Sequence, residues 1–309
     1  MLGIFLVPGA RSQSAPVQPP ETAAELPNGG TFRTTAPLVN LLVTVKNAAG
    51  DLIGELEREH FRVFDQGVQQ DVAIFEHQTA QPLSVALLVD TSLSAKKDLR
   101  LTTQSAARFL NLLVREGNTE DAAALYSFSY QVTLLNAFTR RVARLEDNLQ
   151  KLEADSGTSL YDAVYFSARD FGNRQGRHVL IAITDGTDTT SKKKYREAVE
   201  AAQRADAVVY PIILVPVSAS AGRNTGGEHA LETIAQSTGG KTFYATVGAQ
   251  LDQTFSEILR ELRTQYLIGY YPRGVTSSRN GFHLVRIEIP GKKDLRISAR
   301  TGYYGDSTP

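Results

Sequence analysis

The sequence lacks cysteine and tryptophan, has one methionine, and carries no excess charge, with 33 Lys and Arg residues against 33 Asp and Glu. The missing cysteine excludes disulfides, thiolate zinc sites, iron–sulfur clusters and cysteine nucleophiles. A net charge of zero removes the basic surface with which nucleic-acid-binding proteins neutralise phosphates, so we expect no nucleic-acid partner. The length of 309 residues suggests one large and one smaller domain.

The sequence also has no hydrophobic run long enough to span a membrane, and we expect no integral membrane span. The apolar run at residues 2–7 is short, and no Lys or Arg precedes Arg11. We interpret residues 1–31 as a trimmed, signal-like segment followed by a disordered, Pro/Gly-rich linker, which predicts an extracytoplasmic location, periplasmic or secreted. A disordered N-terminal tail is the alternative interpretation.

Residues 82–264 alternate short apolar runs with helical periodicity, the pattern of repeated βαβ units. Strands are expected at Ser84–Asp90, Ala122–Ser129, His178–Asp185, Ala207–Val217 and Lys241–Thr246. Their continuous apolar character requires helices on both faces of the sheet. Residues 131–139 follow the second strand too closely for a helical crossover and are expected to form an antiparallel edge strand. The predicted fold class is α/β, with a doubly wound, mostly parallel, Rossmann-like six-stranded sheet.

The two flanks of this region, residues 32–80 and 265–304, have the alternating pattern of half-buried strands. Val39, Leu41 and Val43 illustrate the alternation in the first flank. Neither flank alone offers enough strands for a stable sheet. We therefore predict that the flanks combine into one small β-sandwich and that the α/β domain of residues 82–264 is inserted into it.

Polar side chains follow two of the predicted strands. Asp90, Ser92 and Ser94 form a D-x-S-x-S pattern after the first strand, and Asp185 ends the strand that begins at His178. In a doubly wound sheet of order 3-2-1-4-5-6 these two strands are neighbours at the switch point, where ligands bind. Thr158 lies in a loop between them in sequence and adds a third hydroxyl.

Two carboxylates and three hydroxyls make an all-oxygen site, which suits a hard cation such as Mg²⁺, with Ca²⁺ or Mn²⁺ as the other candidates. A loose ligand set of this kind leaves a position open for an acidic partner. The alternative is that Asp and Ser only cap the following helix, since the same residues are preferred there. Asp162 and Asp188 are interpreted as supporting or capping residues rather than metal ligands.

These residues, Asp90-Thr91-Ser92-Leu93-Ser94 with Thr158 and Asp185, resemble the metal-ion-dependent adhesion site of a von Willebrand factor type A (VWA) domain. The resemblance covers about residues 82–264. It implies that Ser92 and Ser94 bind the metal directly, Thr158 directly or through water, and Asp90 and Asp185 mainly through water. Leu93 departs from the glycine usual in bacterial relatives, and we expect it to crowd the rim of the site.

The flanks carry a narrower resemblance. Residues 61–67 and 265–272 resemble those of bacterial VWA-related proteins of the acidobacterial kind, which are mostly predicted to be exported. The family resemblance implies a non-enzymatic, adhesion-type module that binds a partner protein through an Asp or Glu, and we expect no catalytic residue. The alternatives are a metal-dependent hydrolase that uses the same site and a metal-free scaffold. Common nucleotide-binding, hydrolase and zincin motifs are absent from the sequence.

Overall fold

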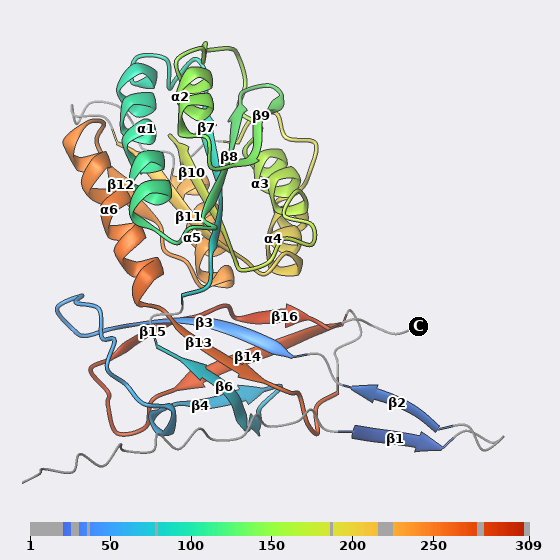
Figure 1. Ribbon diagram of the computed structural model, residues 1–309. Coiled ribbons are helices and arrows are strands. Elements are labelled where there is room, and N and C mark those ends of the chain that lie inside the picture. Colours follow the sequence, from blue (N-terminus) through green and yellow to red (C-terminus); the bar gives the residue numbers. More distant parts are fainter. Residues whose placement is uncertain are drawn as a thin grey trace, which may run out of the picture.

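Eight consecutive buried residues form strand β7 (Leu83–Asp90) near the centre of a six-stranded sheet (Figure 1). The computed structural model describes residues 21–25, 31–35, 38–77, 80–185, 188–215, 225–276 and 281–305. Across the sheet the strands are β12 (Phe243–Ala245), β11 (Ala207–Leu214), β10 (Arg177–Thr184), β7, β8 (Ala122–Phe128) and β9 (Val132–Thr139). All pairs are parallel except β8 with β9. The predicted doubly wound order and the antiparallel edge strand are confirmed.

Both faces of this sheet are covered, because its strands are apolar on both sides. Val85, Leu87 and Val89 face one core cluster, and Ala86 and Leu88 face the other. The first cluster is closed by α1 (Leu99–Glu116), α2 (Val142–Leu149) and α6 (Ala249–Thr264). The second is closed by α3 (Leu160–Arg169), α4 (Tyr195–Arg204) and α5 (Thr225–Thr238). This arrangement leaves the loops at the strand ends as the exposed edges of the sheet.

The flanks form two antiparallel sheets of four strands each, with a short 3₁₀ helix at Arg58–His60. One sheet contains β15 (Arg296–Ser298), β3 (Val39–Lys46), β13 (Tyr266–Tyr270) and β6 (Val72–Glu76). The other contains β16 (Gly302–Tyr304), β14 (Phe282–Glu288), β4 (Arg62–Asp65) and β5 (Val68–Gln70). Leu41, Val63 and Ile268 belong to one core cluster fed by both sheets. The flanks therefore combine into the predicted sandwich.

A buried carboxylate fixes the inside of this sandwich. Asp65 is fully buried and accepts hydrogen bonds from the hydroxyls of Tyr270 and Tyr303, at 2.9 and 2.8 Å. The ring of His283 lies 3.1 Å from the same carboxylate. These contacts join strands from both sheets and satisfy a group that would otherwise be costly to bury.

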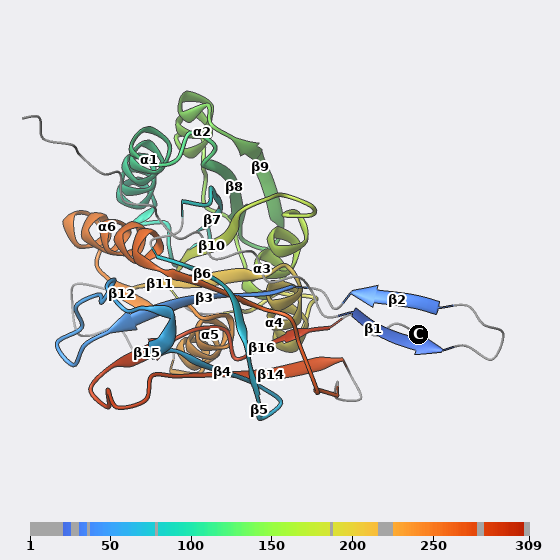
Figure 2. The same ribbon diagram turned by 60° about the horizontal axis from the view of Figure 1, so that its bottom comes forward.

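The N-terminal region differs from the prediction. Strands β1 (Glu21–Glu25) and β2 (Thr31–Thr35) pair with each other in a separate two-stranded sheet, which lies apart from the sandwich sheets in both views (Figures 1 and 2). Residues 21–25 are thus not part of a disordered linker, and residues 31–35 do not pair with the sandwich. Thr and Phe, which make up most of residues 31–35, favour strands. The signal-like residues 1–20 lie outside the described residues.

Within the described residues, no helix is both long enough and apolar enough to cross a lipid bilayer. The sandwich lies at the end of the α/β domain where β7 begins and α6 ends (Figure 1). Helix α6 continues into β13 after a single residue, Gln265.

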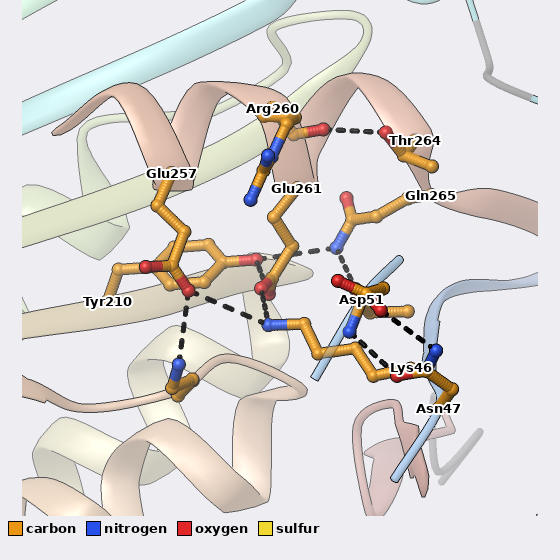
Figure 3. A network of polar contacts seen from close by, with 11 residues as sticks. Lys46, Asn47, Asp51, Tyr210, Glu257, Arg260, Glu261, Thr264 and Gln265 are labelled. Atoms are coloured by element: carbon orange, nitrogen blue, oxygen red, sulfur yellow. Dashed lines mark hydrogen bonds and ion pairs between the residues drawn. The ribbon is translucent and has the colours of Figure 1, made fainter. Parts of the chain in front are cut away.

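A polar network joins the two domains at this junction (Figure 3). Glu261 of α6 is buried. Its carboxylate forms an ion pair with the ammonium of Lys46 in β3 at 2.5 Å and accepts a hydrogen bond from the Tyr210 hydroxyl at 3.0 Å. Gln265 donates to Thr44 Oγ1 at 3.1 Å. Because these partners come from both domains, they hold the amino ends of the strands against the sandwich.

Candidate metal site at the carboxyl edge of the sheet

Asp90 is the last residue of β7 and is buried where the strand meets its loop. One carboxylate oxygen accepts a hydrogen bond from the Ser92 amide at 2.8 Å. The other accepts a hydrogen bond from the Thr184 hydroxyl at 2.7 Å, so both oxygens are engaged by the protein. Thr184 ends β10, and the bond ties together the two strands that flank the switch point. The Asp90 side chain is consequently held in one orientation.

The electrostatic surroundings of Asp90 disfavour its negative charge. Burial raises the pKa of Asp90 to about 6, and the nearby negative charge of Asp185 adds to this rise. Hydrogen bonds from Thr184 and Ser92 act in the opposite direction. Two carboxylates thus share a poorly solvated corner, and a cation placed there would stabilise the charged form of both.

Ser92 and Ser94 lie in the loop that follows. Their hydroxyl oxygens are 3.0 Å apart, with Ser92 buried and Ser94 exposed. They do not cap the next helix, because α1 begins at Leu99 and its N-cap residue is Asp98. The helix-capping explanation of the D-x-S-x-S pattern therefore does not hold here. Leu93, between the two serines, is 58% exposed, and nothing in the loop covers it.

Asp185 directly follows β10, and its carboxylate lies near that of Asp90. Its Oδ1 atom is buried and has no hydrogen-bond partner among the residues that the structure describes. Most buried polar atoms in proteins are paired, so an unpaired carboxylate oxygen calls for an explanation. Among the described residues no group of three or more His, Cys, Asp or Glu side chains is placed to hold a metal. A metal at this edge would accordingly need the hydroxyl oxygens as well as the two carboxylates.

Thr158 lies on the adjoining loop, just before α3. Its amide donates to the hydroxyls of Thr189 and Thr190 at 2.9 and 3.1 Å. This loop contacts the loop that carries Ser92 and Ser94, called the serine loop below, because the Asp155 amide donates a hydrogen bond to the carbonyl of Thr91 at 2.8 Å. The Thr158 hydroxyl makes no hydrogen bond to the residues that the structure describes, and none links it directly to the other four predicted ligands.

Glycine at position 157 permits this loop to approach its neighbour. Gly157 has a φ of +76°, and a Cβ there would lie 3.1 Å from the Cα of Tyr130. The Tyr130 amide donates to the Ser156 carbonyl at 2.8 Å, and the Ser159 hydroxyl donates to the Tyr130 carbonyl at 2.8 Å. The loop that carries Thr158 is therefore held in place by hydrogen bonds to the backbone of Tyr130 from the residues before and after Gly157 and Thr158.

Asp162 and Asp188 act as the supporting residues that the sequence predicts. The Asp162 carboxylate accepts the amides of Lys192 and Lys193, and Asp188 accepts the Tyr161 amide. Sequence reasoning missed the supporting roles of Thr184, Thr189 and Thr190. Thr189 and Thr190 lie in a run of hydroxyl residues shortly after Asp185, but such runs are common in connecting loops and do not by themselves indicate these roles.

Comparisons with known proteins bear on the family and the fold of this chain. The von Willebrand factor type A domain model matches residues 84–257, while no curated protein matches the sequence. Solved structures with a similar fold include the vWF domain of the type V pili tip protein Mfa5 from Porphyromonas gingivalis. That match has 14% identity and a TM-score of 0.48, and covers 64% of this chain and 99% of the other.

Two further solved structures have similar statistics. An aerotolerance-related membrane protein from Bacteroides fragilis has 18% identity and a TM-score of 0.45, with 58% of this chain and 98% of that chain covered. The PilB minor pilin from Streptococcus sanguinis has 14% identity and a TM-score of 0.46, with 61% and 63% covered. At such identities the likeness concerns the fold alone. The family match spans more than half of the sequence and includes Asp90, Thr158 and Asp185, and the chain belongs to the von Willebrand factor type A family.

Proposed function

We propose that this protein is a divalent-cation-dependent protein-binding module of the adhesion type, in which an Asp or Glu of the partner completes the metal's coordination. The observation that carries the proposal is the buried, unpaired Oδ1 atom of Asp185 beside Asp90. A second support is the pair of serine hydroxyls 3.0 Å apart on the adjoining loop. Oxygen donors of this kind suit a hard divalent cation.

The residues divide into two roles. Ser92, Ser94 and Thr158 would bind the metal through their hydroxyls, Thr158 directly or through water. Asp90 and Asp185 would act mainly through water, which agrees with the engagement of both Asp90 oxygens by protein donors. Bound Mg²⁺, Ca²⁺ or Mn²⁺ would supply positive charge and an open position for a carboxylate. Three neutral ligands leave that charge strongly attractive to an acidic partner.

Binding rather than catalysis is favoured by what surrounds these residues. Metal-assisted hydrolysis needs a positioned base or an activated water as well as the ion. Within the described parts of the chain, no histidine hydrogen-bonds to Asp90, Ser92, Ser94, Thr158 or Asp185. The metal-free scaffold is disfavoured because it leaves the buried Asp185 oxygen without a role. For the location, the apolar segment at residues 2–7 supports an extracytoplasmic protein.

The open coordination position can be tested with Mn²⁺, which reports its bound water through water-proton relaxation. We expect N-acetyl-aspartate amide to lower the relaxation enhancement of the protein–Mn²⁺ complex, because its carboxylate displaces metal-bound water. N-acetyl-asparagine amide is the matched control and should leave the signal unchanged. Equal effects of the two compounds, or no enhancement by the protein, would contradict the proposal.

A further inference from the structure

A groove runs beside the serine loop, between α1 and the segment that follows α2. Its volume is about 720 Å³, and its walls include Lys96, Leu99, Arg100, Leu149, Leu152 and Ala154. One end of the groove meets the candidate metal site. Lys96 follows Ser94 by two residues, and Ala154 precedes Asp155, which pairs with Ser92 and donates its amide to Thr91.

The floor of the groove is apolar. Leu99 and Leu149 belong to the core cluster beneath it, and Leu152 and Ala154 are partly buried against the same cluster. Leu93 of the serine loop is a further exposed apolar side chain, three residues before Lys96, with 58% of its surface exposed. A partner that covered these side chains would remove apolar surface from water and gain affinity.

Two of the three charged side chains that line the groove are cations. Lys96 and Arg100 are exposed, and neither forms an ion pair with any residue that the structure describes. Lys151, also exposed and without an ion pair in the described chain, lies next to the groove wall, whereas Glu153 is the acidic side chain of its lining. Many other cations of the molecule are paired, for example Lys46 with Glu261 and Arg108 with Asp252. Unpaired rim charge favours an acidic occupant.

We propose that the groove binds an acidic, amphipathic segment of the same partner whose carboxylate completes the metal site. The proposal rests on the proposed function. It adds the chemical character of the partner's residues that lie beside its metal-binding Asp or Glu. Apolar side chains of the segment pack on Leu99, Leu152 and Ala154, while its acidic side chains face Lys96 and Arg100. The partner's motif is thus a metal-binding Asp or Glu followed by alternating apolar and acidic residues.

The test uses a display library of 12-residue peptides with one fixed central Asp, selected on the full-length protein in Mg²⁺ and eluted with EDTA. We expect the selected peptides to be enriched in apolar and acidic residues on one side of the fixed Asp. A synthetic peptide from this pool should lose about tenfold in affinity for the Lys96→Glu/Arg100→Glu variant, because two favourable rim contacts become repulsive. Mg²⁺ affinity of the variant should not fall.

The matched control is Lys292→Glu/Lys293→Glu, which reverses two exposed cations in a turn of the sandwich. This variant should bind the peptide like the wild type. Mg²⁺-dependent peptides without the apolar and acidic bias, or equal affinities for the groove variant and the wild type, would overturn the groove proposal alone. A library that yields no Mg²⁺-dependent peptide would overturn the proposed function and the groove together.

Discussion

At the amino ends of the parallel strands, the buried carboxylate of Glu261 is bonded by Lys46 and by the Tyr210 hydroxyl (Figure 3). At the carboxyl ends of the same sheet, the buried Oδ1 of Asp185 has no hydrogen-bond partner within the described part of the chain. Both groups incur the cost of leaving water, but only the first recovers it within the chain. The junction network also holds a buried atom without a hydrogen-bond partner among the described residues, Gln265 Oε1, so the contrast concerns the two carboxylates rather than every polar group at the two ends.

The loops at the two ends differ in the same way. At the amino end, the Thr301 amide of the sandwich donates to the Ser237 carbonyl at the end of α5, at 3.1 Å. At the carboxyl end, Ser94 is exposed, and the Thr158 hydroxyl makes no hydrogen bond within the described residues. The amino end is therefore joined to the sandwich by backbone contacts, whereas the carboxyl end presents hydroxyl groups, of which Ser94 is exposed.

Removal of the carboxylate at the amino end should have the largest effect. Glu261→Ala leaves the half-buried Lys46 ammonium and the buried Tyr210 hydroxyl without their partner, and we expect a loss of about 3 kcal/mol in the free energy of unfolding. Urea denaturation measures this loss. Glu257→Ala, one turn away on the same helix, is the comparison variant: it removes only the longer contact with Lys46, at 4.0 Å, and the surface pair with Lys241, and should cost under about 1 kcal/mol. Equal losses for the two variants would show that the network does not support the sheet.

Removal of a carboxylate at the carboxyl end should have the opposite signature. Without metal, Asp185→Asn should unfold at the same urea concentration as the wild type or a higher one, because it removes repulsion toward Asp90. With Mg²⁺ at 100-fold its dissociation constant, the wild type should gain about 2.7 kcal/mol and the variant nothing. A large loss of stability in the metal-free variant would place Asp185 among the supporting residues and break the comparison.

A smaller effect should come from the close approach of the two domains at Gly239. Its φ is +86°, and a Cβ there would lie 2.7 Å from the Arg300 amide nitrogen in the sandwich. We expect Gly239→Ala to cost about 2 kcal/mol through strain and displaced backbone. Gly248 has the same φ with no neighbouring atom within 4 Å, so Gly248→Ala isolates the strain at about 1 kcal/mol. Equal losses of stability for the two variants would mean that the domains can shift at Gly239 without a further energetic cost.

Much of the fold could be predicted from local patterns. Continuous apolar runs identified the buried strands, and the short connection after β8 identified β9 as an antiparallel edge. The same reasoning brought Asp90 and Asp185 to neighbouring strand ends, where the structure places them. Local patterns succeed here because periodicity and strand order decide which residues share an edge.

Other features were beyond the reach of such patterns. Lys46 and Glu261 are separated by 215 positions, and neither local sequence predicts that they pair. The hairpin of residues 21–25 and 31–35 was hidden by the surrounding Pro/Gly-rich composition. The bond from Thr184 to Asp90 depends on side-chain rotamers at adjacent strand ends. Long-range pairing and rotamer choice are tertiary properties, so a single sequence does not reveal them.

The central claim is that the carboxyl edge of the sheet binds a divalent cation through serine hydroxyls. Isothermal titration of Mg²⁺ into the wild type and into Ser92→Ala/Ser94→Ala tests it most directly, with Ser156→Ala, an exposed serine on the adjoining loop, as the control. We predict one-site binding to the wild type and to the control, and no binding heat for the double variant. Indistinguishable isotherms for the wild type and the double variant would contradict the account.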